Sequence, residues 1–199
     1  MLKRVKYLSS ILLAILATAN NLNCAMQEFP SLNDEFIRSC ASGNLVQARE
    51  LIAKGADINY KDHCSYTPLM IACSANKFDI VKLLLEYKAD ATLSDNLGFN
   101  ALLLACFIQK LEIIRLLLEN GADTSINAQG PYGWTALMHS ATNNNINIVQ
   151  LLLDYNADVL IKDNQGETVL DHYLLPEIRT LLQSYIVDTK PSTIIKNQD

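Results

Sequence analysis

The sequence lacks the short motifs that mark common enzyme classes. It contains no G-x-S-x-G, H-E-x-x-H or G-x-x-x-x-G-K segment, so nothing predicts a serine hydrolase, a zinc peptidase or a phosphate-binding loop. No C-x-x-C pair occurs among the five cysteines, which disfavours a thiolate metal site. Asp171 and His172 are adjacent, but neighbours on a helix point in different directions. We therefore expect no catalytic, cofactor-binding or metal-binding residues.

No apolar run reaches the length of about 20 residues that a bilayer-spanning helix requires. The stretch Leu8–Leu16 has only nine residues, follows Lys3, Arg4 and Lys6, and precedes the small residues of Ala17-Thr18-Ala19. This order is typical of a secretory signal peptide and its cleavage site. We therefore predict a signal peptide over residues 1–19 and a linker over 20–30.

The predicted signal implies export to an envelope compartment, the medium or a host cell, with no integral membrane segment after cleavage. A retained membrane anchor and a lipid-modified Cys24 are the alternatives, and cleavage after Ala25 is a further option.

Basic residues are scarce in the rest of the chain. Loss of the signal removes three of the 16 basic residues, leaving 13 Lys and Arg against 21 Asp and Glu and a net charge near −8. An acidic protein repels phosphate backbones, which bind basic patches. We therefore do not expect a nucleic-acid partner.

The chain repeats a unit of about 33 residues. Ala-Asp pairs end at Asp57, Asp90, Asp123 and Asp158, at steps of 33, 33 and 35. A second series opens each unit with a short polar residue of the kind that caps helix N-termini. Its members are Asp34, Thr67, Asn100, Thr135 and Thr168. Leu-rich segments further along each unit predict a second helix covered by its neighbours.

Each second helix is expected to end at a residue with a left-handed backbone. The residues at these positions are Gly55, Lys88, Gly121 and Asn156. Gly and Asn tolerate that conformation, whereas Lys88 should lose roughly 1 kcal/mol there.

The units resemble ankyrin repeats, which have 33 residues, two helices and a T-P-L-H-x-A signature. The signature reads TPLMIA from Thr67, NALLLA from Asn100 and TALMHS from Thr135, without its usual His. The resemblance covers residues 31–187 and implies a mainly α ankyrin-repeat solenoid of about five helix-turn-helix units linked by β-hairpin loops. The unit boundaries are about 31–62, 63–95, 96–128, 129–163 and 164–187. The tail over 188–199 lacks a periodic pattern and is expected to be disordered.

Several cysteines and histidines recur at matching repeat positions. Cys40, Cys73 and Cys106 share one position of three first helices, and stacked helices lie about 8–10 Å apart. A disulfide requires Cα atoms within about 7 Å, so we expect these thiols to be reduced. His139 and His172 also match, but a metal would need further ligands, so we expect a structural role.

The resemblance implies that the hairpin tips and first helices bind a protein. Tyr66, Phe99 and Trp134 precede three successive caps, and aromatic residues are enriched at interface hot spots. In ankyrin repeats this position also packs against the next hairpin, so binding and packing both stay open. The expected partner-binding residues are Lys61, His63, Tyr66, Phe99, Phe107, Ile108, Tyr132, Trp134 and Glu167.

We therefore expect an exported, monomeric ankyrin-repeat protein that binds another protein. An inhibitor or immunity-like protein that blocks one enzyme is the alternative, and an enzyme of unrecognised type is the third option. The sequence does not identify the partner.

Overall fold

The computed structural model describes residues 30–189, with side chains to residue 186. The chain divides into two compact units, Met1–Leu32 and Asn33–Asp199, and the repeats occupy the second. The predicted signal peptide and residues 20–29 of the predicted linker lie outside the described residues. So do residues 190–199 of the predicted tail.

The repeats form four helix pairs followed by a shortened fifth unit. The pairs are α2 (Leu32–Ser42) with α3 (Leu45–Ala53), α4 (Pro68–Ser74) with α5 (Phe78–Glu86), α6 (Ala101–Phe107) with α7 (Leu111–Leu118), and α8 (Ala136–Thr142) with α9 (Ile146–Asp154). In the fifth unit the first helix is reduced to the 3-10 turn η4 (Val169–Asp171), and the second is α10 (Pro176–Thr189). The mainly α repeat fold is therefore confirmed, with α10 continuing two residues beyond the expected end at 187.

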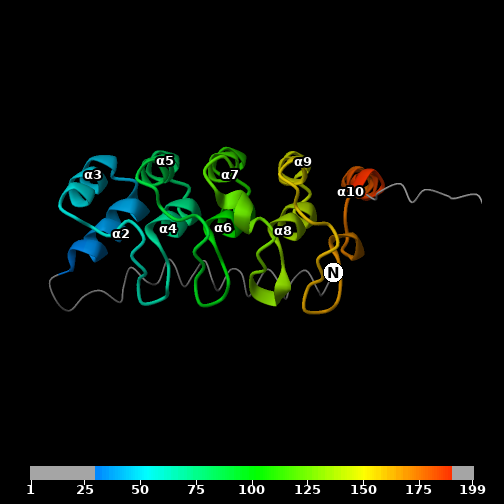
Figure 1. Cartoon of the computed structure of the whole chain (residues 1–199), viewed down its shortest axis with the longest axis horizontal. Helices are drawn as coiled ribbons and strands as arrows, with labels where there is room; N and C mark the ends of the chain where they lie inside the picture. The colour runs from blue at the N-terminus through cyan, green and yellow to red at the C-terminus, as the bar shows by residue number, and fades with distance from the viewer. Residues whose placement is uncertain (1–29, 190–199) are drawn as a thin grey trace, which may run out of the picture. The chain divides into compact units, whose positions relative to one another are not determined.

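Within the repeat unit the helices form two rows. Figure 1 shows α3, α5, α7, α9 and α10 in one row and α2, α4, α6 and α8 in the other, with the hairpin loops extending beyond the second row. The first helices α4, α6 and α8 pack against one another in sequence, as do the second helices α5, α7 and α9. Each helix pair therefore covers the apolar face of its neighbour.

Polar caps start most of the first helices where the sequence predicts them. The side chains of Thr67, Asn100 and Thr135 each accept a hydrogen bond from the backbone N–H three residues later, at 3.3, 2.8 and 3.3 Å. Asp34 is the exception, because α2 already begins at Leu32. The predicted cap at Asp34 is therefore wrong. Its carboxylate instead lies in the first turn of α2, where a negative charge interacts favourably with the positive end of the helix dipole.

The second helices end as predicted. Gly55, Lys88, Gly121 and Asn156 all have positive φ, with a value of 62° at Lys88. The first helices end in the same way at Gly43, Asn76, Gln109 and Asn144. The sequence analysis did not anticipate this second series, although Gly and Asn at a fixed spacing would have indicated it.

Three cysteines occupy the same core position in successive first helices, α2, α4 and α6. Cys40, Cys73 and Cys106 are buried and not disulfide-bonded, as predicted. Desolvation raises the pKa of Cys40 and of Cys106 to about 12, so these thiols stay protonated and unreactive at neutral pH.

The loops between units contain almost no strand structure. Within residues 30–189 the bridge between Ser94 and Asn100 is isolated and no regular strand forms. The expected β-hairpin loops are therefore tight hydrogen-bonded turns. Over the same residues no helix has both the length and the apolar character needed to cross a membrane.

Candidate functional site

A buried or half-buried aspartate builds each of three hairpin tips. In Asp62, Asp95 and Asp163 one carboxylate oxygen accepts hydrogen bonds of 2.8–2.9 Å from the backbone N–H groups two and four residues later. The backbone N–H of the same aspartate donates back to the carbonyl four residues on. The turns are closed from both sides, so side chains on them have well-defined positions. The sequence analysis missed these aspartates, although their repeat spacing was visible.

Hydrogen bonds between neighbouring turns join the first tip to the second and the third tip to the fourth. Lys61 Nζ donates to the carbonyl of Ser94 at 2.8 Å, and Ser65 Oγ donates to Asn96 Oδ1 at 2.9 Å. In the longer hairpin Gln129 donates to the carbonyl of Lys162 at 2.8 Å. Lys61, expected to bind a partner, therefore also ties two tips together.

The three aromatic residues that precede the caps are buried. Tyr66 is 8%, Phe99 4% and Trp134 8% exposed. Of the two alternatives left open by the sequence, this burial fits packing between successive hairpins. Direct contact with a partner would be limited to the small exposed part of each ring.

The exposed apolar surface of the tips comes from other residues. Leu97 is 62% and Tyr132 45% exposed, at matching positions of neighbouring tips. Among the remaining expected residues, His63 is exposed, whereas Phe107, Ile108 and Glu167 are half-buried. Leu97 is a hairpin-tip position by its place in the repeat, but it was not among the predicted partner-binding residues, because its exposure cannot be read from the sequence.

The hairpin that precedes Trp134 is two residues longer than its counterparts, because the step from Asn100 to Thr135 is 35 residues and not 33. This two-residue insertion carries Tyr132 at the surface. Tyr132 itself has a φ of 63°, and its carbonyl accepts a hydrogen bond of 2.9 Å from the N–H of Asn164 in the next tip. Gly133 approaches the same residue so closely that an added Cβ would lie 2.7 Å from the Asn164 nitrogen. The insertion therefore packs directly on the following tip, and this contact fixes the backbone that carries Tyr132.

Two histidines and two aromatic rings form a stack across the last three units. The Trp134 ring centroid lies 5.1 Å from that of His139 and 4.9 Å from that of His172. Phe107 meets His139 edge-on at 6.0 Å. Burial lowers the pKa of His139 to about 4, so its imidazole is neutral at physiological pH. The structural role predicted for both histidines therefore fits this packing.

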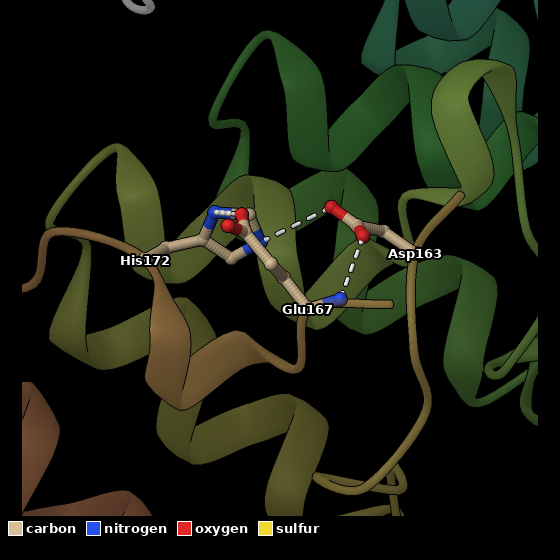
Figure 2. A group of neighbouring side chains, drawn as sticks. All are labelled: Asp163, Glu167 and His172. Atoms are coloured by element: carbon tan, nitrogen blue, oxygen red, sulfur yellow. Dashed lines mark hydrogen bonds and ion pairs between the residues drawn. The ribbon is translucent and has the colours of Figure 1, made fainter. Parts of the chain in front are cut away.

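His172 also belongs to a cluster with Asp163 and Glu167, which we call the His172 cluster (Figure 2). Its Nε2 lies 3.6 Å from Asp163 Oδ2, and its Nδ1 lies 3.9 Å from Glu167 Oε2. One ligand atom from each residue can be chosen so that all three lie within 4.8 Å of one another. The sequence analysis named Glu167 as a partner-binding residue but did not bring it together with Asp163 and His172, because the turn that joins them was not recognised.

Stacked helix pairs linked by hydrogen-bonded turns define a helical repeat protein. Two family models, described as "Ankyrin repeats (3 copies)" and "Ankyrin repeats (many copies)", match residues 36–128 and 117–172. The chain belongs to the ankyrin-repeat family, as the sequence predicted.

Curated proteins of several kinds are similar to this chain. A fowlpox virus (strain NVSL) protein named as an ankyrin repeat protein is 37% identical over 161 residues, covering 75% of this chain and 47% of its own length. A Bos taurus protein named mitochondrial disaggregase is 29% identical over 171 residues, covering 85% of this chain and 25% of its own length. The chain thus spans less than half the length of each of these relatives.

Proposed function

We propose that this chain binds a protein partner through the row of hairpin tips, which we define as residues 61–66, 94–99, 128–134 and 162–167. Ankyrin repeats imply protein partners in general. The observation that carries the proposal is the pair Leu97 and Tyr132, which are exposed at matching positions of adjacent tips. An exposed apolar patch rimmed by polar residues is typical of a contact site.

The rigidity of the tips supports this assignment. Leu97 sits on a turn closed by hydrogen bonds to Asp95, and Tyr132 on a turn closed by the hydrogen bond from the Gly130 N–H to the Trp134 carbonyl. The Tyr132 carbonyl also accepts a hydrogen bond from the Asn164 N–H of the next tip. Fixed turns lose little conformational entropy when a partner binds, so more of the contact energy appears as affinity. A tyrosine is also among the residues most enriched at energetic hot spots.

Other predicted partner-binding residues lie on a neighbouring tip and at the end of a first helix. Phe107 and Ile108 are half-buried at the end of α6, and His63 is exposed at a neighbouring tip. Charged and polar groups at an interface rim set specificity and association rate more than affinity. Lys61 and Glu167 would act in this way, whereas Tyr66, Phe99 and Trp134 support the tips from below.

The proposal includes export by residues 1–19 and assigns no reaction to the chain itself. Both parts rest on the sequence. If the partner is an enzyme whose activity falls on binding, the chain acts as an inhibitor, which is the alternative function.

Capture of partners from the native cell and its surroundings tests the proposal. The test variant carries Leu97→Ser and Tyr132→Ser. The control variant carries Phe78→Ser and Ile146→Ser, which alter apolar residues of similar exposure, 42% and 44%, on α5 and α9. These two helices lie in the row remote from the hairpin loops (Figure 1).

The wild-type chain and the control variant should retain the same partner, and the tip variant should lose it. Melting temperatures of the three proteins should agree within a few degrees, because all four positions are exposed. Equal capture by the tip variant, or loss in the control variant alone, would contradict the proposal.

A further inference from the structure

We propose that Asp163, Glu167 and His172 bind one divalent transition-metal ion, with zinc as the favoured species. The cluster lies in the last repeat, between its hairpin tip and the turn η4. Asp163 and Glu167 lie in the last hairpin tip, whereas Leu97 and Tyr132 carry the proposed partner contact. Zinc binding is measured on the chain alone, so its outcome does not depend on whether the proposed partner surface is correct.

Two buried polar atoms of the cluster lack hydrogen-bond partners. Asp163 uses Oδ1 to accept from two backbone N–H groups, which leaves Oδ2 without a hydrogen bond. His172 Nε2 is likewise buried and has no hydrogen bond. These atoms face each other at 3.6 Å, beyond the 2.7–3.2 Å typical of an N–H···O hydrogen bond. Unsatisfied buried polar atoms are costly, so the arrangement favours a third atom between them.

The spacing suits a metal ion in that position. Ligand atoms at about 2.1 Å from a tetrahedral zinc ion lie about 3.4 Å from one another. The 3.6 Å separation of Asp163 Oδ2 and His172 Nε2 is close to this value. Glu167 completes the set within 4.8 Å, and its side chain is 35% exposed, so a small rotation brings its carboxylate closer. Water reaching the exposed side would supply the fourth ligand.

The chemistry of the ligands also favours zinc. An imidazole nitrogen with two carboxylate oxygens is a donor set that zinc accepts and that calcium and magnesium, which prefer oxygen, do not. Two ionised carboxylates with a neutral imidazole balance the charge of one divalent ion. The ion would therefore replace an unfavourable pair of neighbouring negative charges by a neutral site.

Neighbouring groups orient the imidazole of His172. The Trp134 ring stacks against it at 4.9 Å between centroids. Arg179 donates hydrogen bonds to the carbonyls of Leu170 and His172 at 2.8 and 3.1 Å, which fixes the backbone of the turn. Groups that hold a ligand in place raise metal affinity without contacting the ion.

The preceding repeats explain why the cluster forms in the last unit. Glu167 and His172 occupy the positions that Trp134 and His139 hold one unit earlier. The earlier unit therefore has an indole where the last unit has its second carboxylate. At the Asp95 tip the hydroxyl of Tyr66 hydrogen-bonds to the aspartate. The Asp95 carboxylate is therefore satisfied by an aromatic residue of the preceding tip, without a metal.

Titration of the reduced, metal-free full chain with zinc chloride in a calorimeter tests the proposal. A background Cys64→Ser substitution removes the half-buried thiol from competition for zinc. Asp163→Asn and His172→Gln test the cluster, and His63→Gln, at an exposed histidine of another tip, is the matched control. Asn at 163 keeps the Oδ1 acceptor, so the turn should still close.

One zinc ion per chain should bind the parent protein and the His63→Gln control. Affinity should fall at least tenfold in Asp163→Asn and in His172→Gln, and zinc should raise the melting temperature of only the first two proteins. If Asp163→Asn does not fold, His172→Gln decides the result. Absence of binding by the parent, or undiminished binding by His172→Gln, overturns the proposal.

Discussion

The Trp134 indole and the His172 imidazole lie 4.9 Å apart between ring centroids, inclined by 56°. The same indole lies 5.1 Å from the His139 ring, also between centroids. A single tryptophan thus contacts a histidine of its own repeat and one of the last repeat. It contributes to cohesion between units, which is where most of the stability of a repeat array arises.

Substitution of Trp134 by Ala should therefore destabilise the fold strongly. Loss of a buried tryptophan costs about 3–5 kcal/mol, because it leaves a cavity between two repeats. Tyr132→Ala, two residues earlier but 45% exposed, should change the free energy of unfolding by less than about 1 kcal/mol. Urea denaturation followed by far-UV circular dichroism measures both. Equal stability of the two variants would contradict the packing role of Trp134.

Lys88→Gly should stabilise the protein. Lys88 has a φ of 62°, and this conformation costs a residue with a Cβ about 1–2 kcal/mol of stability. Gly avoids this strain, but its greater freedom in the unfolded chain lowers stability by about 0.5–1 kcal/mol. The net gain should be about 0.5–1 kcal/mol, seen as a higher melting temperature. Asn156→Gly is the control, since Asn at the corresponding position already tolerates its φ of 61°. A lower melting temperature for Lys88→Gly would show that strain there is negligible.

Gly133→Ala and Gly166→Ala form a matched pair that isolates the contact between two tips. Both glycines have nearly the same φ, 77° and 79°. A Cβ at Gly166 meets nothing within 4 Å, whereas at Gly133 it would lie 2.6 Å from Asn164 Oδ1. Gly166→Ala should cost about 1 kcal/mol of backbone strain, and Gly133→Ala a further 1–3 kcal/mol from overpacking. Equal losses in chemical denaturation would mean that the insertion does not press on the next tip.

His139 should make stability depend on pH. Its pKa of about 4 in the folded protein lies below the ordinary value near 6.5, so the unfolded chain binds the extra proton between these limits. The contribution of His139 to the free energy of unfolding is fully present above pH 6.5. It is lost as the pH falls towards 4, by up to about 3 kcal/mol.

His139→Leu, which copies Leu104 of the preceding repeat, should remove this pH dependence. The comparison needs denaturation midpoints of both proteins at pH 7.5 and pH 5, because other groups then cancel in the difference. If the denaturation midpoint shifts equally between pH 7.5 and pH 5 in the wild type and in His139→Leu, water must reach His139 in the folded protein.

The repeat fold could be predicted from the sequence because its determinants are local and periodic. Caps such as Thr67 and helix-ending residues such as Gly121 follow from single residue types at a fixed spacing, and both stand where expected. Asp34 fell outside the rule, because α2 already begins at Leu32.

The arrangement of side chains at the tips could not be predicted in the same way. Whether Trp134 faces solvent or the next hairpin depends on contacts with His139 and His172, which the spacing alone does not reveal. The His172 cluster was missed because Asp163, Glu167 and His172 are brought together by a tight turn. Recurrence of Asp62 and Asp95 marked that turn but did not show which carboxylate oxygen remained available.

Site-specific photocrosslinking tests the central claim, that the tips are the face that meets the partner. A photoreactive phenylalanine analogue would replace Tyr132 in one protein and Ile146, at the start of α9, in a control of similar exposure. We predict that illumination of the native mixture joins the partner to position 132 and not to position 146. Crosslinking from position 146 with none from position 132 would place the interface on the opposite row of helices and contradict the account.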